Sequence, residues 1–265
     1  DAALWIYHHH PGKSIQAMVT LCLENNLQVT DTTNFEATQV LHEWGLVQKQ
    51  TRTLTSAGAA FYEIWHSRRT EAIDILHGLQ YQLWSRLRPE DNPASWAYKT
   101  ICDILWQTQT MPQAKDFAAM IAAQRQKSSQ GPSQAGAAFS TKSIHDAYDW
   151  LLPLRPPVLL GVKSSQQGRS FKEAIFVRRA YCSLPLFVMA VSYFMRETDH
   201  PWGDTLRIGE EERHTVCAAS LVEPDTFPVL LGRAADRYPN LIRVQQTSSA
   251  IAVALPRPIR VEDFA

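Results

Sequence analysis

The sequence predicts a mainly helical α+β protein with a winged-helix-like unit at each end and a helical body between them. Apolar residues recur at steps of three and four along most of the 265 residues, which is the period of an amphipathic helix. Residues 41–58 follow the order of helix, glycine stop, hairpin and helix cap, which is typical of a winged helix-turn-helix. Residues 208–255 repeat this architecture near the C-terminus.

The N-terminal unit is expected to begin with a supporting helix over residues 14–25. Its apolar side chains fall at helical steps, and Ser14 is placed to cap it. A second helix follows and ends at Trp44, because Gly45 can adopt the left-handed conformation of a C-terminal stop. The helix in this position is the one that such folds usually lay in the DNA major groove.

A short hairpin, or wing, is expected after that helix. The alternating runs 46–50 and 53–54 predict its two strands. Thr55 or Ser56 is then placed to cap the next helix, because a hydroxyl side chain can accept a hydrogen bond from the first backbone N–H groups.

The body of the protein is expected to be helical. Residues 56–87 have a helical pattern almost without interruption, with possible breaks at 68–70 and at Gly78. A proline-containing loop separates them from two further helices, over residues 94–107 and 112–127.

A flexible linker is predicted between two domains. Residues 128–140 are small, polar and aperiodic, a composition typical of linkers. We therefore expect a first domain over residues 1–127, which holds the N-terminal winged helix and its helical extension. The second domain covers residues 141–265 and ends in the second winged-helix-like unit.

The C-terminal domain is expected to combine helices with short β-rich runs. Ser183 and Pro185 fit the start of a capped helix with proline in its first turn. In chain order, the expected elements are helix 141–152, strands 158–162 and 171–177, helices 184–196, 208–219 and 229–238, and strands 241–246 and 251–255.

The composition argues against several classes of protein. Lysine plus arginine and aspartate plus glutamate each number 26, so no global field attracts nucleic acid and any affinity must come from local patches. No run of about 18 apolar residues is present, so we expect no membrane-spanning helix. The four cysteines lie far apart without a Cys-x-x-Cys pair, which favours reduced, buried thiols and a cytoplasmic protein.

Ten basic residues are the candidate DNA contacts. Five of them lie between positions 163 and 179, in a segment rich in serine and glutamine that suits phosphate contact. Two others are one helical turn apart on the helix before the second wing. The full set is Lys49, Arg52, Lys163, Arg169, Lys172, Arg178, Arg179, Arg233, Arg237 and Arg243.

The helix before the first hairpin has an acidic face. It carries Glu36 and Glu43 and no basic residue apart from His42, so phosphates would be repelled. The N-terminal unit is therefore as consistent with protein contact as with DNA contact. This observation supports an alternative role as a scaffold or adaptor subunit of a multiprotein complex.

No catalytic, metal or cofactor site is predicted. The acidic residues between 199 and 212 match no spacing expected of a metal-dependent nuclease. Gly12 and Lys13 lack the earlier glycine of a phosphate-binding loop. The adjacent histidines 8–10 cannot easily hold one zinc ion together. We expect a non-enzymatic protein, and a metal-dependent nuclease is the least favoured alternative.

The patterns at residues 37–47, 55–58, 72–84 and 95–98 carry a family resemblance. Their order resembles an uncharacterised bacterial family encoded beside DNA phosphorothioation and phage-defence genes. Proteins of this family run from a winged helix into a helical body and close with another small helical unit. Residues 30–34 stand where that family has a glycine-rich turn, and no functional residue is carried over.

These observations together predict a non-enzymatic protein that binds double-stranded DNA. The resemblance implies a role in a bacterial DNA transaction, such as phage defence or transcription control. We expect other protein subunits as further partners and no membrane.

Overall fold

The computed structural model divides the chain into two compact units. The first comprises residues 1–72 and 260–265, and the second comprises residues 73–259. The structure describes residues 2–26, 36–85, 92–112, 116–117, 119–121, 141–165, 168–171, 173–247 and 250–265. Within these ranges the protein is mainly helical, and its strands form small antiparallel sheets.

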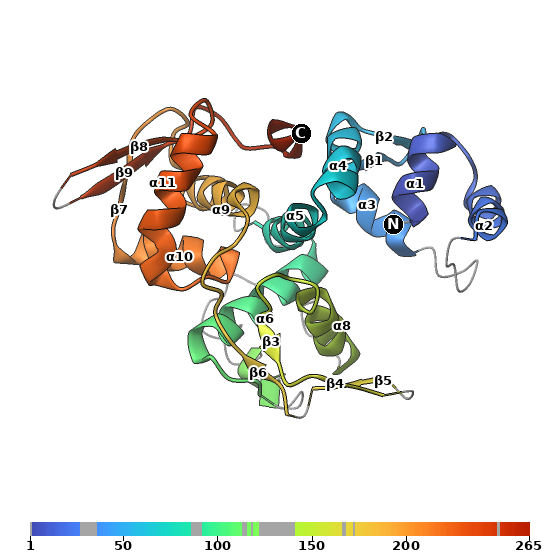
Figure 1. The fold of residues 1–265 in the computed structure, drawn as a ribbon, viewed down its shortest axis with the longest axis horizontal. Coiled ribbons are helices and arrows are strands. Elements are labelled where there is room, and N and C mark those ends of the chain that lie inside the picture. The colour runs from blue at the N-terminus through green and yellow to red at the C-terminus, as the bar shows by residue number, and fades with distance from the viewer. Residues whose placement is uncertain are drawn as a thin grey trace. The chain divides into compact units, whose positions relative to one another are not determined.

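The first unit is built from short helices and one antiparallel hairpin (Figure 1). The helices on either side of the hairpin and the supporting helix were predicted, whereas the first helix was not. The elements are α1 (Ala2–His9), α2 (Ile15–Glu24), α3 (Glu36–Glu43), β1 (Val47–Gln48), β2 (Thr53–Leu54), α4 (Ser56–Ser67) and the 3₁₀ helix η3 (Val261–Phe264).

Local sequence signals set the helix ends in this unit. Ser14 accepts a hydrogen bond from the Ala17 N–H at 3.2 Å at the start of α2. Thr55 accepts one from the Gly58 N–H at 3.0 Å at the start of α4. Gly45 follows α3 with a φ of +70°, a conformation that glycine adopts without steric cost. These caps and this stop confirm the predictions made for them.

The end of the described chain returns to the first unit. Val261 and Phe264 of η3 are buried, and η3 packs against α4. Ser56 Oγ donates a hydrogen bond to the carboxylate of Glu262, 206 residues away, at 2.8 Å. Arg68 donates to the carbonyl oxygen of Phe264. The sequence analysis assigned this segment to the C-terminal domain, because no local pattern reports a contact over such a separation.

The second unit contains the remaining helices and strands. The division between the units falls inside its first helix, α5. The elements are α5 (Arg69–Gln82), α6 (Pro93–Thr108), α8 (Thr141–Leu151), β3 (Leu159–Leu160), β4 (Lys163–Ser165), β5 (Gly168–Ser170), β6 (Ile175–Phe176), α9 (Leu184–Glu197), β7 (Leu206–Ile208), α10 (Glu210–Ser220), the 3₁₀ helix η2 (Pro224–Thr226), α11 (Phe227–Arg237), β8 (Arg243–Gln246) and β9 (Ile251–Ala254).

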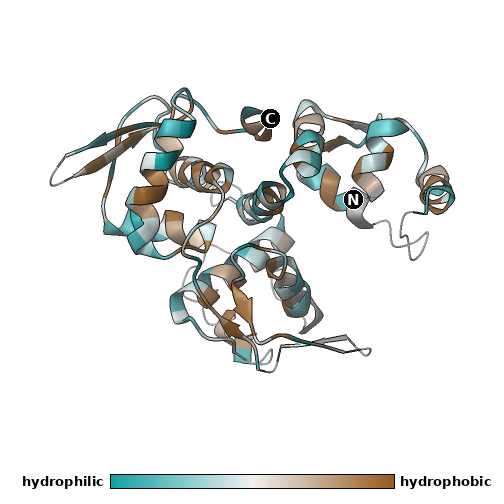
Figure 2. Cartoon of the chain, in the orientation of Figure 1, coloured by the Kyte–Doolittle hydropathy of each residue, from teal (hydrophilic) through white to brown (hydrophobic). Residues whose placement is uncertain are grey.

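Helix α9 lies at the centre of the second unit. Every residue from 185 to 195 is buried, and the helix is apolar over most of its length (Figure 2). Both α10 and α11 pack against it, and the rings of Phe187 and Phe227 lie 5.3 Å apart. Gly78 lets α5 approach α9, because a Cβ there would lie 3.0 Å from a leucine side chain of α9. Helix α5 therefore continues through Gly78. The helical run is interrupted at Arg68 instead, between the end of α4 and the start of α5.

A three-stranded antiparallel sheet is formed by the strand that follows α9 and by the hairpin that follows α11. Its strand order is β7-β9-β8, and the β8–β9 hairpin extends beyond the helices (Figure 1). The two long strands were predicted. Strand β7 was not, because its three residues are too few to establish a period of two.

The compact units divide the chain at other positions than the predicted domain boundary. The expected linker, 128–140, lies outside the described residues, and the compact units divide at 72/73 and at 259/260 instead. Helix α6, predicted to belong with the N-terminal winged helix, packs against α10 in the second unit. The indole Nε1 of Trp106 on α6 donates a hydrogen bond to the carbonyl oxygen of Val222 at 2.9 Å. Composition revealed a segment suited to a linker but could not reveal this long-range contact.

We predict opposite effects for two glycine-to-alanine substitutions in helices. The Cβ of Gly58→Ala would lie 1.8 Å from the carbonyl oxygen of Leu46, whereas that of Gly232→Ala meets nothing within 4 Å. Gly58→Ala should therefore lower the free energy of unfolding by about 2 kcal/mol or more through overpacking. Gly232→Ala should raise it by roughly 0.5–1 kcal/mol through helix propensity. Urea denaturation followed by circular dichroism measures both, and equal effects would contradict the prediction.

Candidate nucleic-acid interface

Helix α11 is fixed by one face and exposes the other. Four of its side chains, Phe227, Leu230, Leu231 and Ala234, are buried. The opposite face carries Arg233 and Arg237, both exposed and four residues apart, so they lie one above the other on the helix surface. Both of these predicted contacts therefore have the exposure that DNA binding requires.

The exposed face of α11 also carries little side-chain bulk at Gly232. Gly232 lies next to Arg233, and no atom lies within 4 Å of the position of a Cβ there. A glycine inside a helix makes the fold less stable than an alanine would, by up to about 1 kcal/mol. Because a Cβ at position 232 would meet nothing, packing within the chain does not explain why glycine is present there. Val229, one turn earlier, is 57% exposed. A partner that approaches the helix backbone closely would account for both residues.

The outer face of the three-stranded sheet carries further basic side chains. Val253 of the central strand is buried, and side chains alternate between the faces of a sheet. Ala252 and Ala254 therefore point outward, and their cross-strand partners are Arg207 and Arg243. Both arginines are exposed. Arg207 was missed in the sequence, because the three residues of β7 are too few to establish an alternating pattern.

Arg178 is held by a tryptophan and a glutamate. Its guanidinium carbon lies 4.0 Å from the centroid of the Trp106 ring. Its Nε and Nη2 both donate to the carbonyl oxygen of Trp106, at 3.0 and 2.9 Å, and Nη1 lies 3.3 Å from a carboxylate oxygen of Glu223. The donors of this side chain are therefore engaged within the second unit, in contrast to the predicted phosphate contact.

Arg179 is a core residue, so its predicted role as a DNA contact is wrong. Its side chain is fully buried and pairs with Asp74 of α5 at 2.7 Å. A second guanidinium nitrogen donates to the carbonyl oxygen of Ser220, at the end of α10, at 2.6 Å. The other carboxylate oxygen of Asp74 accepts the N–H of Ser183, which caps α9, at 2.7 Å. The pair of arginines in the sequence looked like a basic patch because residue type does not report burial.

A neutral histidine lies beside this ion pair. His77 is buried, and its Nε2 donates to the carbonyl oxygen of Ala219 at 3.0 Å, which leaves Nδ1 to accept from the Tyr98 hydroxyl at 2.8 Å. Burial, and secondarily the positive charge of Arg179, lower the pKa of His77 to about 4. The imidazole therefore acts as a hydrogen-bond bridge between α6 and α10 rather than as a cation.

The remaining predicted contacts belong to other segments of the chain. Lys163 is exposed and pairs with Glu173 at 2.6 Å. Lys49 is exposed in the hairpin of the first unit, where Arg52 donates to the carbonyl oxygen of Lys13 at 3.4 Å. Arg169 belongs to β5, but its side chain is outside the described part of the structure, as is the whole of Lys172. In the second unit, Arg233, Arg237 and Arg243 are thus exposed, as is Arg207.

Other chemistry is limited in the part of the chain that the structure describes. There, no three histidine, cysteine or acidic side chains are grouped so that they could hold a metal ion. No described helix has the length and apolar character needed to cross a membrane. The four cysteines are free and buried, as expected, and burial raises the pKa of the Cys217 thiol to about 12. The thiols are therefore protonated and unreactive at neutral pH.

Comparisons with protein-family models, with curated proteins and with solved structures find no match to this chain.

We predict that the buried ion pair is far more important for stability than an exposed one. Asp74→Asn should lower the free energy of unfolding by about 3–5 kcal/mol, because it leaves the Arg179 charge buried without a counter-charge. The control Glu173→Gln, which removes the exposed partner of Lys163, should cost at most about 1 kcal/mol. Chemical denaturation gives both values.

A double substitution separates charge from packing at the same position. In Asp74→Leu with Arg179→Met, no unpaired charge remains, so the double variant should be more stable than either single one. A double variant as unstable as the sum of both singles would show that the hydrogen bonds, rather than the charges, dominate.

We predict a loss of stability in mild acid that depends on His77. Its pKa is about 4 in the folded chain against 6.5 for the free side chain, so the unfolded chain binds the proton more readily. The free energy of unfolding should fall as the pH drops from about 6.5 towards 4, by about 3 kcal/mol in total. Urea denaturation at stepped pH measures this slope. His77→Gln should flatten it, and the exposed control His145→Gln should not.

Proposed function

We propose that the chain is a non-enzymatic protein that binds double-stranded DNA through a winged helix at the end of the second unit. In this proposal α9, β7, α10, α11, β8 and β9 are the elements of the winged helix, and the β8–β9 hairpin is the wing. The order helix, strand, helix, helix, strand, strand supports it, as does the sheet order β7-β9-β8. Helix α11 directly precedes the hairpin, which is the position of a groove-reading helix.

The observation that carries the proposal is the exposed face of α11. Arg233 and Arg237 project from a helix whose other face is buried. Arginine forms paired hydrogen bonds to guanine edges, and Gly232 between Val229 and Arg233 leaves room for a base pair or sugar to approach the helix. On the sheet, Arg207 and Arg243 are suited to phosphate contact, which positions a protein without reading sequence.

The cellular role that we propose is a bacterial DNA transaction such as phage defence or transcription control. Its support is the resemblance carried by residues 37–47, 55–58, 72–84 and 95–98. The chain has 26 basic and 26 acidic residues, so binding without sequence preference should be weak and strongly dependent on salt.

We predict that charge reversal on α11 abolishes DNA binding. Arg233→Glu with Arg237→Glu places two carboxylates where phosphates or guanines would lie, so affinity for duplex DNA at low salt should fall at least about a hundredfold. Fluorescence anisotropy with a labelled duplex measures this. The control Lys13→Glu with Lys49→Glu makes the same change in charge on exposed residues of the first unit.

The two double variants together locate the interface. If the control loses as much affinity as the α11 variant, contact through the second unit alone is wrong and the first wing takes part. If the wild-type protein binds no duplex at low salt, the proposal itself fails.

A scaffold or adaptor role is the second candidate, and it also rests on specific residues. Leu160 and Ile175 are paired across β3 and β6 and are 40% and 54% exposed. In the first unit, the helix before the hairpin ends with the exposed Glu43. Co-purification from the native host tests this role: a scaffold retains stoichiometric partners after nuclease treatment, whereas partners held through DNA are lost.

A further inference from the structure

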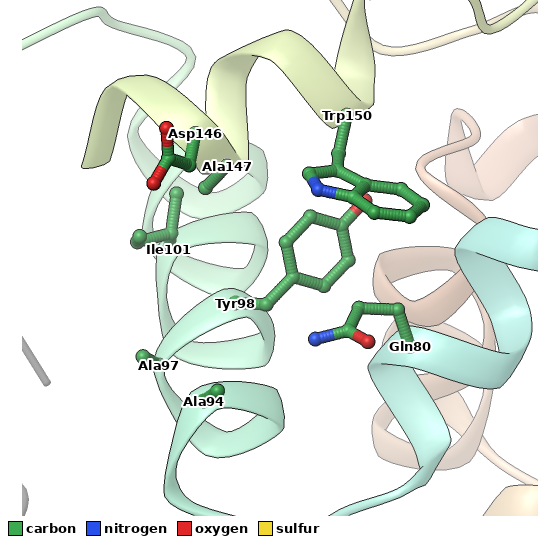
Figure 3. Close-up of a pocket in the computed structure, with 8 residues that line it drawn as sticks. All are labelled: Gln80, Ala94, Ala97, Tyr98, Ile101, Asp146, Ala147 and Trp150. Atoms are coloured by element: carbon green, nitrogen blue, oxygen red, sulfur yellow. The ribbon is translucent and has the colours of Figure 1, made fainter. Parts of the chain in front are cut away.

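A cavity of about 270 Å³ lies between α5, α6 and α8 in the second unit (Figure 3). Tyr98, Gln80 and Trp150 line it, and all three already interact with other groups of the chain. A ligand there would have to displace existing contacts. The exposed face of α11 differs, because within the described residues the side chains of Arg233 and Asp236 have no hydrogen bond or ion pair.

The exposed face of α11 carries an apolar, a basic and an acidic side chain in one row. Val229 is 57% exposed, and Arg233 and Asp236 are exposed four and seven residues later. Residues three or four apart are neighbours on a helix surface, so each of these side chains lies next to the following one. The buried side chains of α11 lie on the other face, so the row is open to a partner.

The carboxylate of Asp236 decides which part of DNA this row can meet. It would repel a phosphate, although Arg233 and Arg237 beside it are positive. In the major groove, cytosine and adenine present amino groups that donate hydrogen bonds to a carboxylate, and guanine presents two acceptors to arginine. A row that combines carboxylate and guanidinium groups is therefore suited to base edges more than to the phosphate backbone.

Val229 has the chemistry of a thymine contact. The 5-methyl group of thymine is an apolar group in the major groove, and contact with an exposed valine removes apolar surface of both from water. Valine is short, so the helix has to come close to the base. Gly232, three residues later, permits this approach, because no atom lies within 4 Å of the position that a Cβ would take there.

We propose that α11 recognises a guanine and a nearby thymine of duplex DNA, an inference that rests on the proposed placement of this helix in the major groove. Arg233 binds the O6 and N7 atoms of the guanine, and Val229 packs on the 5-methyl group of the thymine. Four residues span about 6 Å along a helix, and stacked base pairs are about 3.4 Å apart, so the two bases lie within about two base pairs of each other. Asp236 accepts a hydrogen bond from a cytosine or adenine amino group on the side of the guanine away from the thymine.

Selection from a random duplex library with the full chain identifies the preferred site, which should contain this pair of bases. Deoxyuridine in place of the thymine removes only the methyl group and should weaken binding about fourfold. 7-Deazaguanine in place of the guanine removes the N7 acceptor and should weaken binding about tenfold. Fluorescence anisotropy with labelled duplexes measures both ratios.

Matched variants assign each preference to a side chain. Val229→Ala should bind the thymine and deoxyuridine duplexes equally, whereas the control Ile175→Ala, which truncates an exposed apolar side chain outside α11, should keep the difference. Arg233→Ala should lose the sensitivity to 7-deazaguanine. Arg243→Ala removes the same charge from the sheet, so it should weaken binding overall but retain that sensitivity.

The proposal is overturned if the deoxyuridine duplex binds as well as the thymine duplex, or if Val229→Ala or Arg233→Ala keeps the preference assigned to it. It is also overturned if duplex DNA is bound but selection returns no preferred sequence, an outcome that leaves the proposed function intact. Absence of any duplex binding overturns both.

Discussion

The buried pair of Asp74 and Arg179 is the interaction on which the second unit depends. It joins α5 to the turn that follows β6, and the same two side chains bind the N–H of Ser183 and the carbonyl oxygen of Ser220. Two charges removed from water are stable only when their hydrogen-bonding groups are well satisfied. The start of α9 and the end of α10 supply those partners, so both helices are held by the need to satisfy one ion pair.

The backbone of Arg179 strengthens this arrangement. Its N–H donates to the carbonyl oxygen of Leu221 at 2.8 Å, and its own carbonyl oxygen accepts the N–H of Glu223 at 2.9 Å. Arg178 engages Glu223 and Trp106 next to it. The segment between α10 and α11 is therefore attached to α5 and α6, and this attachment places α11 on the core with its arginine face exposed.

Helices α5, α6 and α10 are connected by the same polar network. Tyr98, which lines the cavity, is bound to His77, and His77 is bound to the carbonyl oxygen of Ala219 one residue before Ser220. The wall of the cavity and the end of α10 thus share one chain of hydrogen bonds. In this network most buried donors find an acceptor, as is usual for buried polar groups, and the Nε of Arg179 is an exception.

Local features of this protein could be predicted from its sequence because they depend on neighbours within a few residues. The caps at Ser14, Thr55 and Ser183 and the glycine stop at Gly45 are of this kind. So is the spacing of Arg233 and Arg237, which a helix of any protein would bring together. The mainly helical fold class follows from the same local periods.

Features that depend on distant partners could not be predicted in this way. Arg178 and Arg179 looked as available to DNA as Arg233 and Arg237, and only Trp106, Glu223 and Asp74 distinguish them. The return of η3 to α4, the grouping of α6 with α10 and the cavity between α6 and α8 also require residues far apart in the chain. The sequence shows the charge and the hydrophobic period of each segment. Whether a segment is buried depends on which other parts of the chain pack against it.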